Sequence, residues 1–374
     1  MRALFWISVA LLAWAQLGYG AFLAGLRRLV TRTWEPPAPG ARRPRVSLIV
    51  AAYREEAVIG AKVANALALD WPRERLEVIV AVDGGAVAGA DATADRARAA
   101  GADVVLELQR GGKYRAQDAA VQVASGELLA FSDANALWEP DALTHLAAAF
   151  DDPQVGYACG QVRFVNDAGT NQEGLYWRYE MWLREHESAL ASVTAGNGAI
   201  YAMRPDAFLP IEGHDLALPF NVVKGGRRAV YVPLARATEK MVPTVEGEWE
   251  RKRRMMRYAW PIVLQGGLGD PRGYPPLYAL MIASHRLLRY VSPFLHVLAA
   301  LATLALLGRG RAYAAAAAVQ AATVVAALAG GRSRSRPLLV ARYYVLTTAA
   351  VAAGLYDWLR HGTEAGWDQA EGTR

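Results

Sequence analysis

The stretch Val46-Ser47-Leu48-Ile49-Val50-Ala51-Ala52 decides the fold of this chain. It is almost continuously apolar and rich in β-branched residues, which is the pattern of a strand buried on both faces of a sheet. Polar residues begin with Tyr53-Arg54-Glu55-Glu56, so the strand ends there, and a helical pattern follows over residues 56–69. A buried strand that leads directly into a helix is the first unit of an α/β fold.

The alternation of strand and helix continues along the chain. Helical patterns occur at 92–100 and 114–124, and strand patterns at 76–82, 103–108 and 127–131. Strands that alternate with helices form a mostly parallel sheet covered by helices on both faces. We therefore predict a Rossmann-like α/β domain over residues 45–247.

Apolar runs flank this domain on both sides. The first, over residues 3–26, is long enough to cross a hydrocarbon core of about 30 Å. It is longer than the apolar part of a signal peptide and ends in Arg27 and Arg28 instead of a small-residue cleavage site, so we interpret it as an anchor. The middle one of the C-terminal runs is rich in alanine and is the weakest span. These runs lie at 291–307, 313–328 and 338–359.

The distribution of arginine predicts the orientation, because Lys and Arg are retained on the cytoplasmic side of a span. Only Arg2 precedes the first run, whereas six arginines follow it within residues 27–45. We expect a multi-pass protein of the plasma (inner) membrane with its α/β domain in the cytoplasm. Three spans after the domain would place the acidic C-terminal tail outside. The predicted segments are a transmembrane helix at 1–28, a linker at 29–44, the α/β domain at 45–247, interfacial amphipathic helices at 248–289, three transmembrane helices at 290–360 and a polar tail at 361–374.

The charge and the cysteine content exclude some classes of protein. The net charge of +6 does not indicate nucleic acid, because much of the basic excess lies beside the predicted spans. There it meets the anionic headgroups of membrane lipids. The single cysteine, Cys159, excludes an intramolecular disulfide and a cysteine-based zinc site, and we expect it to be a buried thiol.

Polar clusters stand at the ends of the predicted strands, where ligands bind in sheets of this kind. Asp133 and Asn135 are two residues apart in Ser132-Asp133-Ala134-Asn135, so both can reach one hard divalent cation, Mg²⁺ or Mn²⁺, that also holds a diphosphate. The alternative is an ordinary turn that caps the next helix. Asp83 opens a Gly-Gly turn and can accept hydrogen bonds from a base or ribose, or else stabilise its own turn.

Three further segments carry groups suited to chemistry. Gly111-Gly112-Lys113 presents a cation to phosphate, although this sequence is also common in surface loops. Asp215 lies between a glycine turn and an apolar segment and can take a proton from a hydroxyl group, with a capping role as the alternative. The basic and aromatic stretch 248–260 can neutralise a departing diphosphate, can lie at the membrane interface, or can do both.

In this order, the clusters resemble the family 2 glycosyltransferases, the group that includes cellulose and hyaluronan synthases. The resemblance covers about residues 46–260 and the flanking membrane arrangement. Tyr176–Glu180 and Gly198–Arg204 resemble the membrane-bound members in particular. The other matching parts are Val46–Glu56, Asp83–Gly85, Gly112-Lys113, Gly126–Asn135 and Arg251–Arg254.

The resemblance implies a GT-A fold and a set of site residues. A UDP- or GDP-sugar would be the donor, and a divalent cation would bind with it. The metal ligands are then Asp133 and Asn135. The donor is then bound by Tyr53, Glu55, Asp83, Lys113 and Asp133. The catalytic residues are then Asp215 as general base, with Arg251 and Arg254 in the position of the Gln-x-x-Arg-Trp motif.

The implied activity is inverting transfer of a sugar to a lipid or polysaccharide acceptor at the cytoplasmic face, with a membrane protein for export as a further partner. The chain departs from the family pattern at four residues, because Asn135 replaces an acid, His214 stands where an acid usually precedes the base, and Arg251 and Met255 replace Gln and Trp. These departures motivate an alternative, an inactive membrane scaffold that pairs with an active synthase. A nicotinamide-dependent reductase is disfavoured, because no Gly-x-Gly-x-x-Gly turn follows the first strand.

Overall fold

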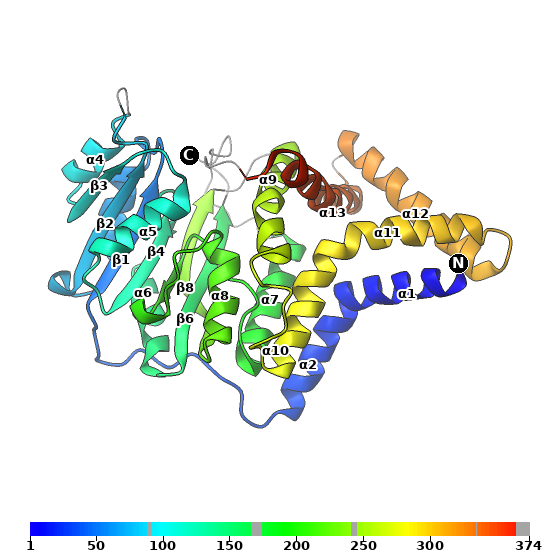
Figure 1. Cartoon of the computed structure of the whole chain (residues 1–374), viewed down its shortest axis with the longest axis horizontal. Helices are drawn as coiled ribbons and strands as arrows, with labels where there is room; N and C mark the ends of the chain where they lie inside the picture. The colour runs from blue at the N-terminus through cyan, green and yellow to red at the C-terminus, as the bar shows by residue number, and fades with distance from the viewer. Residues whose placement is uncertain (88–90, 166–173, 241–244, 334, 364–374) are drawn as a thin grey trace. The chain divides into compact units, whose positions relative to one another are not determined.

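The computed structural model describes residues 1–87, 91–165, 174–240, 245–333 and 335–363 and forms two compact units. The sheet unit comprises Leu26–Pro243 and Asp270–Tyr278. The helical unit comprises Met1–Gly25, Thr244–Gly269 and Ala279–Thr363. Figure 1 labels their helices and strands.

In the described residues, the sheet unit holds a mixed sheet of eight strands in the order β3-β2-β1-β4-β7-β6-β8-β5. β1 pairs in parallel with β2 and β4, and β2 pairs in parallel with β3. β6 and β8 are also parallel, whereas β7 is antiparallel to both of its neighbours. The strands are β1 (Val46–Ala52), β2 (Leu76–Asp83), β3 (Val104–Leu108), β4 (Leu128–Asp133), β5 (Leu137–Trp138), β6 (Val155–Val165), β7 (Tyr201–Met203) and β8 (Arg228–Lys240).

Helices cover both faces of this sheet. In β1 every residue except Ala51 is buried, as expected for a strand covered on both sides. α3 packs apolar residues at helical spacing, Ile59 and Val63, against Val50 in one cluster of the core. α5 contacts β1 and β2 through its own buried residues, which include Ala116 and Ala120. The helices of this unit are α3 (Ile59–Leu67), α4 (Thr93–Ala99), α5 (Lys113–Val123), α6 (Ala142–Ala148), α7 (Leu175–Leu190) and α8 (His214–Lys224).

The predicted mostly parallel α/β sheet is confirmed, with strand bounds close to the expected ones. The sequence patterns did not predict β6, β7 and β8. β6 and β8 are strands of 11 and 13 residues that extend the sheet beyond β4. Cys159 lies within β6 and is a free, buried thiol, as expected.

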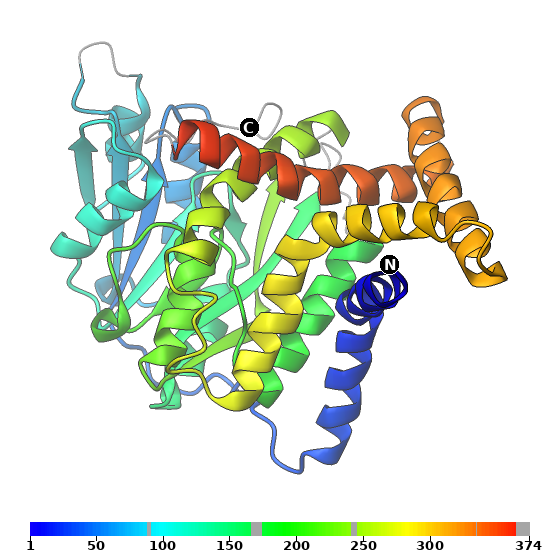
Figure 2. The ribbon, with the colours of Figure 1, turned by 45° about the vertical axis from the view of Figure 1, so that its right-hand side comes forward.

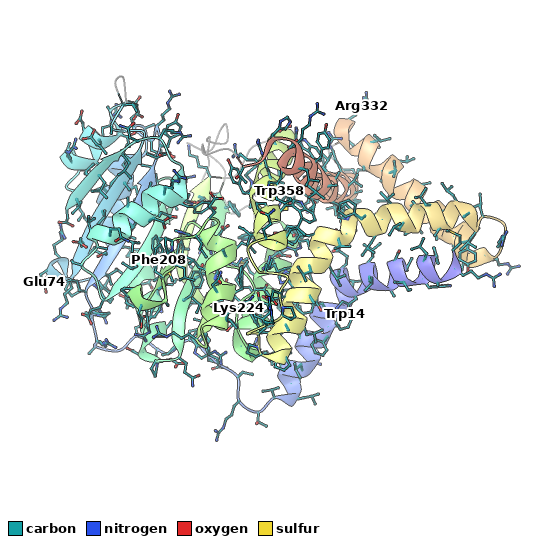
Figure 3. All side chains as sticks on the ribbon, viewed as in Figure 1. Trp14, Glu74, Phe208, Lys224, Arg332 and Trp358 are labelled. Atoms are coloured by element: carbon teal, nitrogen blue, oxygen red, sulfur yellow. The ribbon has the colours of Figure 1, made fainter. Side chains whose placement is uncertain are left out.

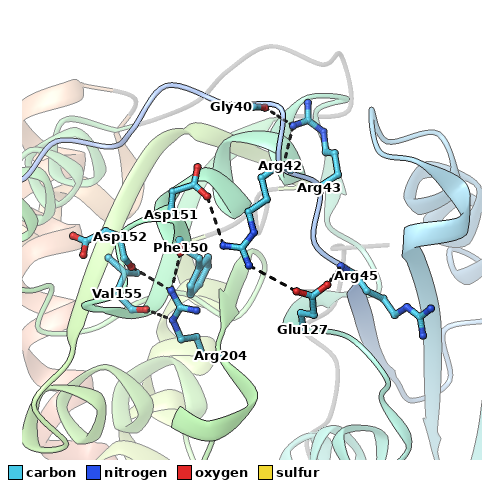
Figure 4. Close-up of polar contacts among 10 residues, drawn as sticks. All are labelled: Gly40, Arg42, Arg43, Arg45, Glu127, Phe150, Asp151, Asp152, Val155 and Arg204. Atoms are coloured by element: carbon cyan, nitrogen blue, oxygen red, sulfur yellow. Dashed lines mark hydrogen bonds and ion pairs between the residues drawn. The ribbon is translucent and has the colours of Figure 1, made fainter.

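Arginines attach the linker before β1 to the amino ends of the strands (Figure 4). Arg42 lies between Glu127 and Asp151, with nitrogen–oxygen distances of 3.7 and 4.0 Å. The backbone N–H of Arg45 donates to the same Glu127 carboxylate at 3.0 Å. Nearby, Arg204 donates to the carbonyl oxygens of Phe150, Asp152 and Val155. These contacts hold the linker and the amino ends of the strands together, whereas the polar clusters predicted to carry chemistry lie at the carboxyl ends of the strands.

Four helices are long and apolar enough to cross a membrane, and they are Arg2–Leu29, Pro276–Ala305, Arg311–Arg332 and Arg336–His361. The second begins before the residues 290–360 expected for the C-terminal spans, because Pro276 starts a continuous helix that runs through a π-helical turn. Within them lie α1 (Arg2–Ala13), α2 (Tyr19–Leu29), α10 (Pro276–Met281), α11 (Leu288–Ala305), α12 (Arg311–Ala329) and α13 (Arg336–His361). α9 (Val245–Leu264) is a charged helix that follows the first of these candidate spans in the chain and precedes the other three.

We predict that Gly126→Ala destabilises the sheet unit by about 1–3 kcal/mol, the usual effect of an overpacked site. The added Cβ would overlap the backbone nitrogen of Ser47 on β1 and lie 2.6 Å from the carbonyl oxygen of Leu128 on β4. Gly60→Ala is the control, because a Cβ there meets no atom within 4 Å and alanine favours the helix by up to about 1 kcal/mol. The thermal unfolding midpoints of both variants measure the effect, and equal midpoints would contradict the prediction.

Candidate functional site

The carboxyl ends of β1, β2 and β4 bring the predicted polar clusters to one edge of the sheet. In the parallel register Ala52 of β1 pairs with Val82 of β2, and Ala51 pairs with Asp133 of β4. Asp83 therefore lies on one side of the carboxyl end of β1, and Asp133 lies on the other side. The loops that leave these strands hold the residues described below.

The carboxylate of Asp83 organises the loop before α5. Asp83 is buried and accepts hydrogen bonds from the backbone N–H groups of Gly111 and Gly112 at 2.6 and 3.0 Å. It also forms an ion pair with Arg110. These contacts place the loop so that Lys113 is the first residue of α5. The role expected for Asp83 at a base or ribose stays a prediction.

Arg110 and Tyr53 form a stacked pair beside Asp83. The guanidinium carbon of Arg110 lies 3.3 Å from the centre of the Tyr53 ring. Gly84, at a φ of +80°, passes the same ring, where an added Cβ would lie 3.5 Å from it. Arg54 has a φ of +53°, which non-glycine residues rarely adopt outside functional or strained turns. The neighbouring Glu55 is buried.

Lys113 and Asp133 form an ion pair at the centre of this edge. Burial alone would lower the pKa of Lys113, but the negative charges of Asp133 and Asp215 outweigh it and hold the pKa above its ordinary value. Asp215 therefore lies close enough to the Lys113 ammonium group to interact with it. The structure pairs Lys113 of α5 with Asp133 of β4, and Asp215 of α8 is near enough for its charge to act on Lys113.

The loop Gly196-Asn197-Gly198 passes between these charges. The N–H of Gly196 donates to the carbonyl oxygen of Asp215 at 2.7 Å. At Gly198 an added Cβ would lie 2.9 Å from Lys113 Nζ and 3.6 Å from Asp133 Oδ2. A Cβ at this position would contact the ion pair, and the end of the Lys113 side chain would have to shift. The loop thus links the first turn of α8 to the Lys113–Asp133 pair.

His214 fixes the first turn of α8 next to Asp215. It is buried, its Nε2 lies 3.4 Å from Asp118 Oδ1 on α5, and its Nδ1 lies 3.2 Å from the hydroxyl group of Tyr201 on β7. The ring of Phe208, labelled in Figure 3, meets the imidazole edge-on at 5.4 Å between centroids. Asp118 was missed in the sequence because nothing local connects it to a residue about a hundred positions away.

Two polar residues of α3 hold the segment that follows Asp133 and Asn135. Lys62 is fully buried, and its Nζ donates to the carbonyl oxygen of Ala136 at 2.7 Å. Asn65 exchanges two hydrogen bonds with the backbone of Trp138, both of 2.9 Å. Together they fix the backbone that leaves the Asp133 turn. Lys62 and Asn65 lie on the inward side of α3, at the helical spacing of its apolar residues. That spacing is the signal in the sequence by which they could have been found.

The oxygen donors at this turn fit a cation that substrate phosphates help to hold. Asp133 supplies a carboxylate and Asn135 an amide oxygen at the end of β4. Among the described residues, no three His, Cys, Asp or Glu side chains are grouped closely enough to hold a metal ion. Mg²⁺ does not need such a group, because it is usually bound by one or two carboxylates together with waters and phosphate oxygens of the substrate.

Arg251 and Arg254 lie on α9, in the helical unit. Arg251 donates two hydrogen bonds to the carboxylate of Glu248, at 2.7 and 2.8 Å. Burial would raise the pKa of Glu248, but the guanidinium of Arg251 outweighs it and the pKa is held below its ordinary value. The catalytic roles expected for Arg251 and Arg254 stay predictions.

We predict a pH dependence of stability that comes from Lys62. Burial lowers the pKa of Lys62 to about 7. From that pH up to the ordinary lysine pKa of about 10.4, the unfolded chain binds more protons than the folded one, so the unfolding free energy rises with pH. The slope from this group is at most about 1.4 kcal/mol per pH unit.

Lys62→Met should lose this slope, because it keeps a chain of similar length but cannot titrate. Thermal unfolding of parent and variant at about pH 7, 8 and 9 measures the difference. Lys224→Met, at the end of α8, is the matched control and should keep the slope of the parent. Parallel stability curves for the parent and Lys62→Met would show the prediction to be wrong.

Comparisons with known proteins agree with this architecture. The chain is 25% identical over 267 residues to the beta-monoglucosyldiacylglycerol synthase of Trichormus variabilis, covering 64% of this chain and 55% of the relative. It is 27% identical over 239 residues to an N-acetylglucosaminyltransferase of Rhizobium leguminosarum bv. viciae, covering 56% and 54%. The chain thus spans about half the length of the curated relatives it matches.

A solved structure shares the fold over nearly the whole chain. It is the mannosyltransferase PcManGT from Pyrobaculum calidifontis in complex with GDP-Man and Mn2+. The TM-score is 0.75 at 24% identity, with 95% of this chain and 99% of that chain covered. Residues 47–208 match the sequence family described as Glycosyl transferase family 2. The predicted GT-A fold is confirmed, and the resemblance of the sequence to the family 2 glycosyltransferases is supported by this match, which covers less than half of the chain.

Proposed function

We propose that this chain transfers a sugar from a nucleotide-sugar donor to a hydroxyl group of a lipid acceptor, with inversion at the anomeric carbon. The observation that carries the proposal is the group formed by Lys113, Asp133 and Asp215 around the Gly196–Gly198 loop. Two sugar-transferring relatives support it, one named for a glucosyldiacylglycerol product and one solved with GDP-Man.

The donor would lie along the carboxyl ends of β1, β2 and β4. Tyr53, whose ring carries the Arg110 guanidinium, would contact the nucleobase, and Asp83 fixes the loop that would present Lys113 to phosphate oxygens. Arg110 adds a second positive charge on the same loop. A UDP- or GDP-sugar fits this arrangement, because its two phosphates need positive charge and its base needs a flat contact.

A divalent cation, Mg²⁺ or Mn²⁺, would be held by Asp133 and Asn135. When bound, it would neutralise the negative charge of the nucleoside diphosphate leaving group. The protein keeps the ligand turn in place from behind, through the hydrogen bonds of Lys62 and Asn65 to the backbone at 136 and 138. Lys113 would add a positive charge that neutralises the same leaving group.

Asp215 would act as the general base. Its carboxylate takes the proton of the acceptor hydroxyl while that oxygen forms a bond to the anomeric carbon. The bond from that carbon to the diphosphate breaks at the same time, and its electron pair leaves on the phosphate oxygen. A single displacement of this kind inverts the anomeric configuration. His214, held by Asp118 and Tyr201, keeps the first turn of α8 in position for Asp215.

The reaction would take place at the cytoplasmic face of the plasma membrane. Four helices long and apolar enough to span a bilayer support a membrane-bound chain, and a lipid acceptor would be reached there. The six arginines within residues 27–45 favour the cytoplasmic side for the domain. Export of a product would need a further membrane protein as partner.

We predict that Asp133→Asn and Asp215→Asn each lower turnover by about 100-fold or more, the scale on which a proton-transfer group such as Asp215 or a group that stabilises the charge of the leaving group, such as Asp133, contributes to catalysis. Both changes keep side-chain shape and remove one charge. Asp95→Asn is the control, because that side chain is 85% exposed and pairs only with Arg98 on the same helix. Release of nucleoside diphosphate from a labelled donor by purified membranes measures turnover, and full activity in either site variant would refute the assignment.

Donor binding separates an active enzyme from an inactive scaffold. A ligand that binds only the folded state at a concentration of about 100 times its Kd stabilises it by about 2.7 kcal/mol. We expect the unfolding temperature to rise with one class of nucleotide sugar in the presence of Mn²⁺, and this rise to be lost in Asp133→Asn. No shift with any UDP- or GDP-sugar would favour the scaffold.

A further inference from the structure

Contacts within the helical unit define two ends of its helix bundle. α1 and α11 run antiparallel, because Phe5 near the start of α1 clusters with Ala302 and Leu306 at the end of α11. Further along, Trp14 donates to the hydroxyl group of Ser284 at 2.9 Å. We call the level of Phe5 and Leu306 the distal end of the bundle. The proximal end is the opposite one, toward which α1 runs.

α13 runs antiparallel to α11, from the distal to the proximal end. His296 of α11 lies 2.7 Å from the hydroxyl group of Tyr344, early in α13. One step toward the proximal end, the Trp260 ring of α9 packs on Tyr290 of α11 while its N–H donates to the carbonyl oxygen of Val351 at 2.8 Å. The earlier residue of α11, Tyr290, therefore lies near the later residue of α13, Val351, which is the order of two antiparallel helices.

The last turns of α13 are bound to α9. Arg253 donates two hydrogen bonds to Asp357, at 2.6 and 2.8 Å, and Arg257 donates to the carbonyl oxygen of Gly362 at 2.6 Å. The two backbones approach closely at Gly354, where an added Cβ would lie 2.9 Å from the carbonyl oxygen of Arg253. α9 is charged along its first part and is not a candidate span. The chain is therefore at the proximal end at α9 and again at Gly362.

A chain that leaves one side of a bilayer and returns to it crosses an even number of times. Three candidate spans lie between α9 and Gly362, so one of them does not cross. α11 and α13 each run between the two ends, as their contacts show. The remaining candidate is the alanine-rich helix α12.

Both ends of α12 lie at the distal end. Tyr313, in its first turn, belongs to the cluster of Phe5 and Leu306. Gly330, just after its last residue, lies against Leu338 and Arg342 at the start of α13, where an added Cβ would be 3.1 Å from Arg342 Cβ. Two views agree that α12 passes across the ends of α11 and α13 (Figures 1 and 2).

α12 is an alanine-rich helix that is apolar on all sides and carries its charges at its two ends. Alanine buries only one methyl group, so an alanine-rich helix gains less than a leucine-rich one by entering the hydrocarbon. Exposed arginines stand at both of its ends, including Arg332, which Figure 3 labels at the tip of the helix. Arginines at both ends can reach the phosphate groups of one leaflet when the helix lies flat. They are Arg309, Arg311, Arg332 and Arg336.

We propose that this chain crosses the bilayer three times, that α12 lies along the distal lipid surface, and that α13 ends on the side of the α/β domain. The crossing segments are then Arg2–Leu29, Pro276–Ala305 and Arg336–His361. Among the described residues, no candidate span lies between the strands of the domain and α9, so we place the domain, α9 and the end of α13 on one side of the bilayer. This arrangement replaces the expected external tail with one on the side of the domain.

Single cysteines test the arrangement, because Cys159 is the one cysteine of the chain. In a Cys159→Ala background, Leu307→Cys and Ser335→Cys place a thiol in the loops before and after α12. A membrane-impermeant maleimide is added to sealed vesicles of known orientation carrying the full chain. We expect both thiols to react from the same side, the side of an Ala3→Cys reference. Reaction from opposite sides would mean that α12 crosses and would overturn the proposal.

Two further thiols fix the side of the chain end. His361→Cys should react from the side of an Ala41→Cys reference in the linker before β1. Reaction of position 361 with the Ala3→Cys side would overturn the proposal. An epitope tag after residue 374 gives the same answer in the unaltered chain, because protease should remove it from the side that exposes Ala41. None of these readouts depends on glycosyl transfer, so the topology stands or fails separately from the proposed activity.

Discussion

The ion pair of Lys113 and Asp133 is the interaction on which the arrangement of this site depends. Two charges that are largely removed from water are costly unless each keeps its partner in place. Lys113 is placed by Asp83, which fixes the loop at Gly111 and Gly112. Asp133 is placed by the α3 residues that bind the backbone behind it. The pair therefore joins two loops that would otherwise each carry an unpaired, half-buried charge.

In the proposed reaction this pair also explains how the site tolerates the absence of donor. Without donor, Lys113 compensates the charge of Asp133. With a diphosphate and its cation bound, Lys113 would pair with the diphosphate and Asp133 with the cation. Asp215 adds a second negative charge that acts on Lys113 and, with Asp133, holds the pKa of Lys113 above its ordinary value. Gly198 leaves the space in which that exchange can occur, because it presents no side chain to the pair.

The local sequence predicted the strands and the residues at their ends, because β1 is apolar on both faces and its end is marked by Tyr53. Parallel pairing then brings Asp83 and Asp133 to one edge without further information. The supports behind them could not be read in this way. The hydrogen bond from Lys62 to Ala136 joins residues 74 positions apart, and His214 meets Asp118 only because α8 and α5 share a face of the sheet. Such contacts come from tertiary packing and leave no periodic pattern.

The same limit applies to the membrane helices. Length and apolar content identify four segments that can cross, but which of them do cross depends on where their ends are bound. α9 carries a run of positive charges within four residues, which repel one another along one helix. Glu248 compensates Arg251 locally, whereas Arg253 has a local partner in Glu250 at 3.8 Å and a closer one in Asp357, 104 positions away. That distant countercharge both stabilises α9 and determines where α13 must end. Hydropathy alone does not indicate that the end of α13 lies beside α9. The hydrogen bonds of Arg253 and Arg257 to Asp357 and Gly362 do.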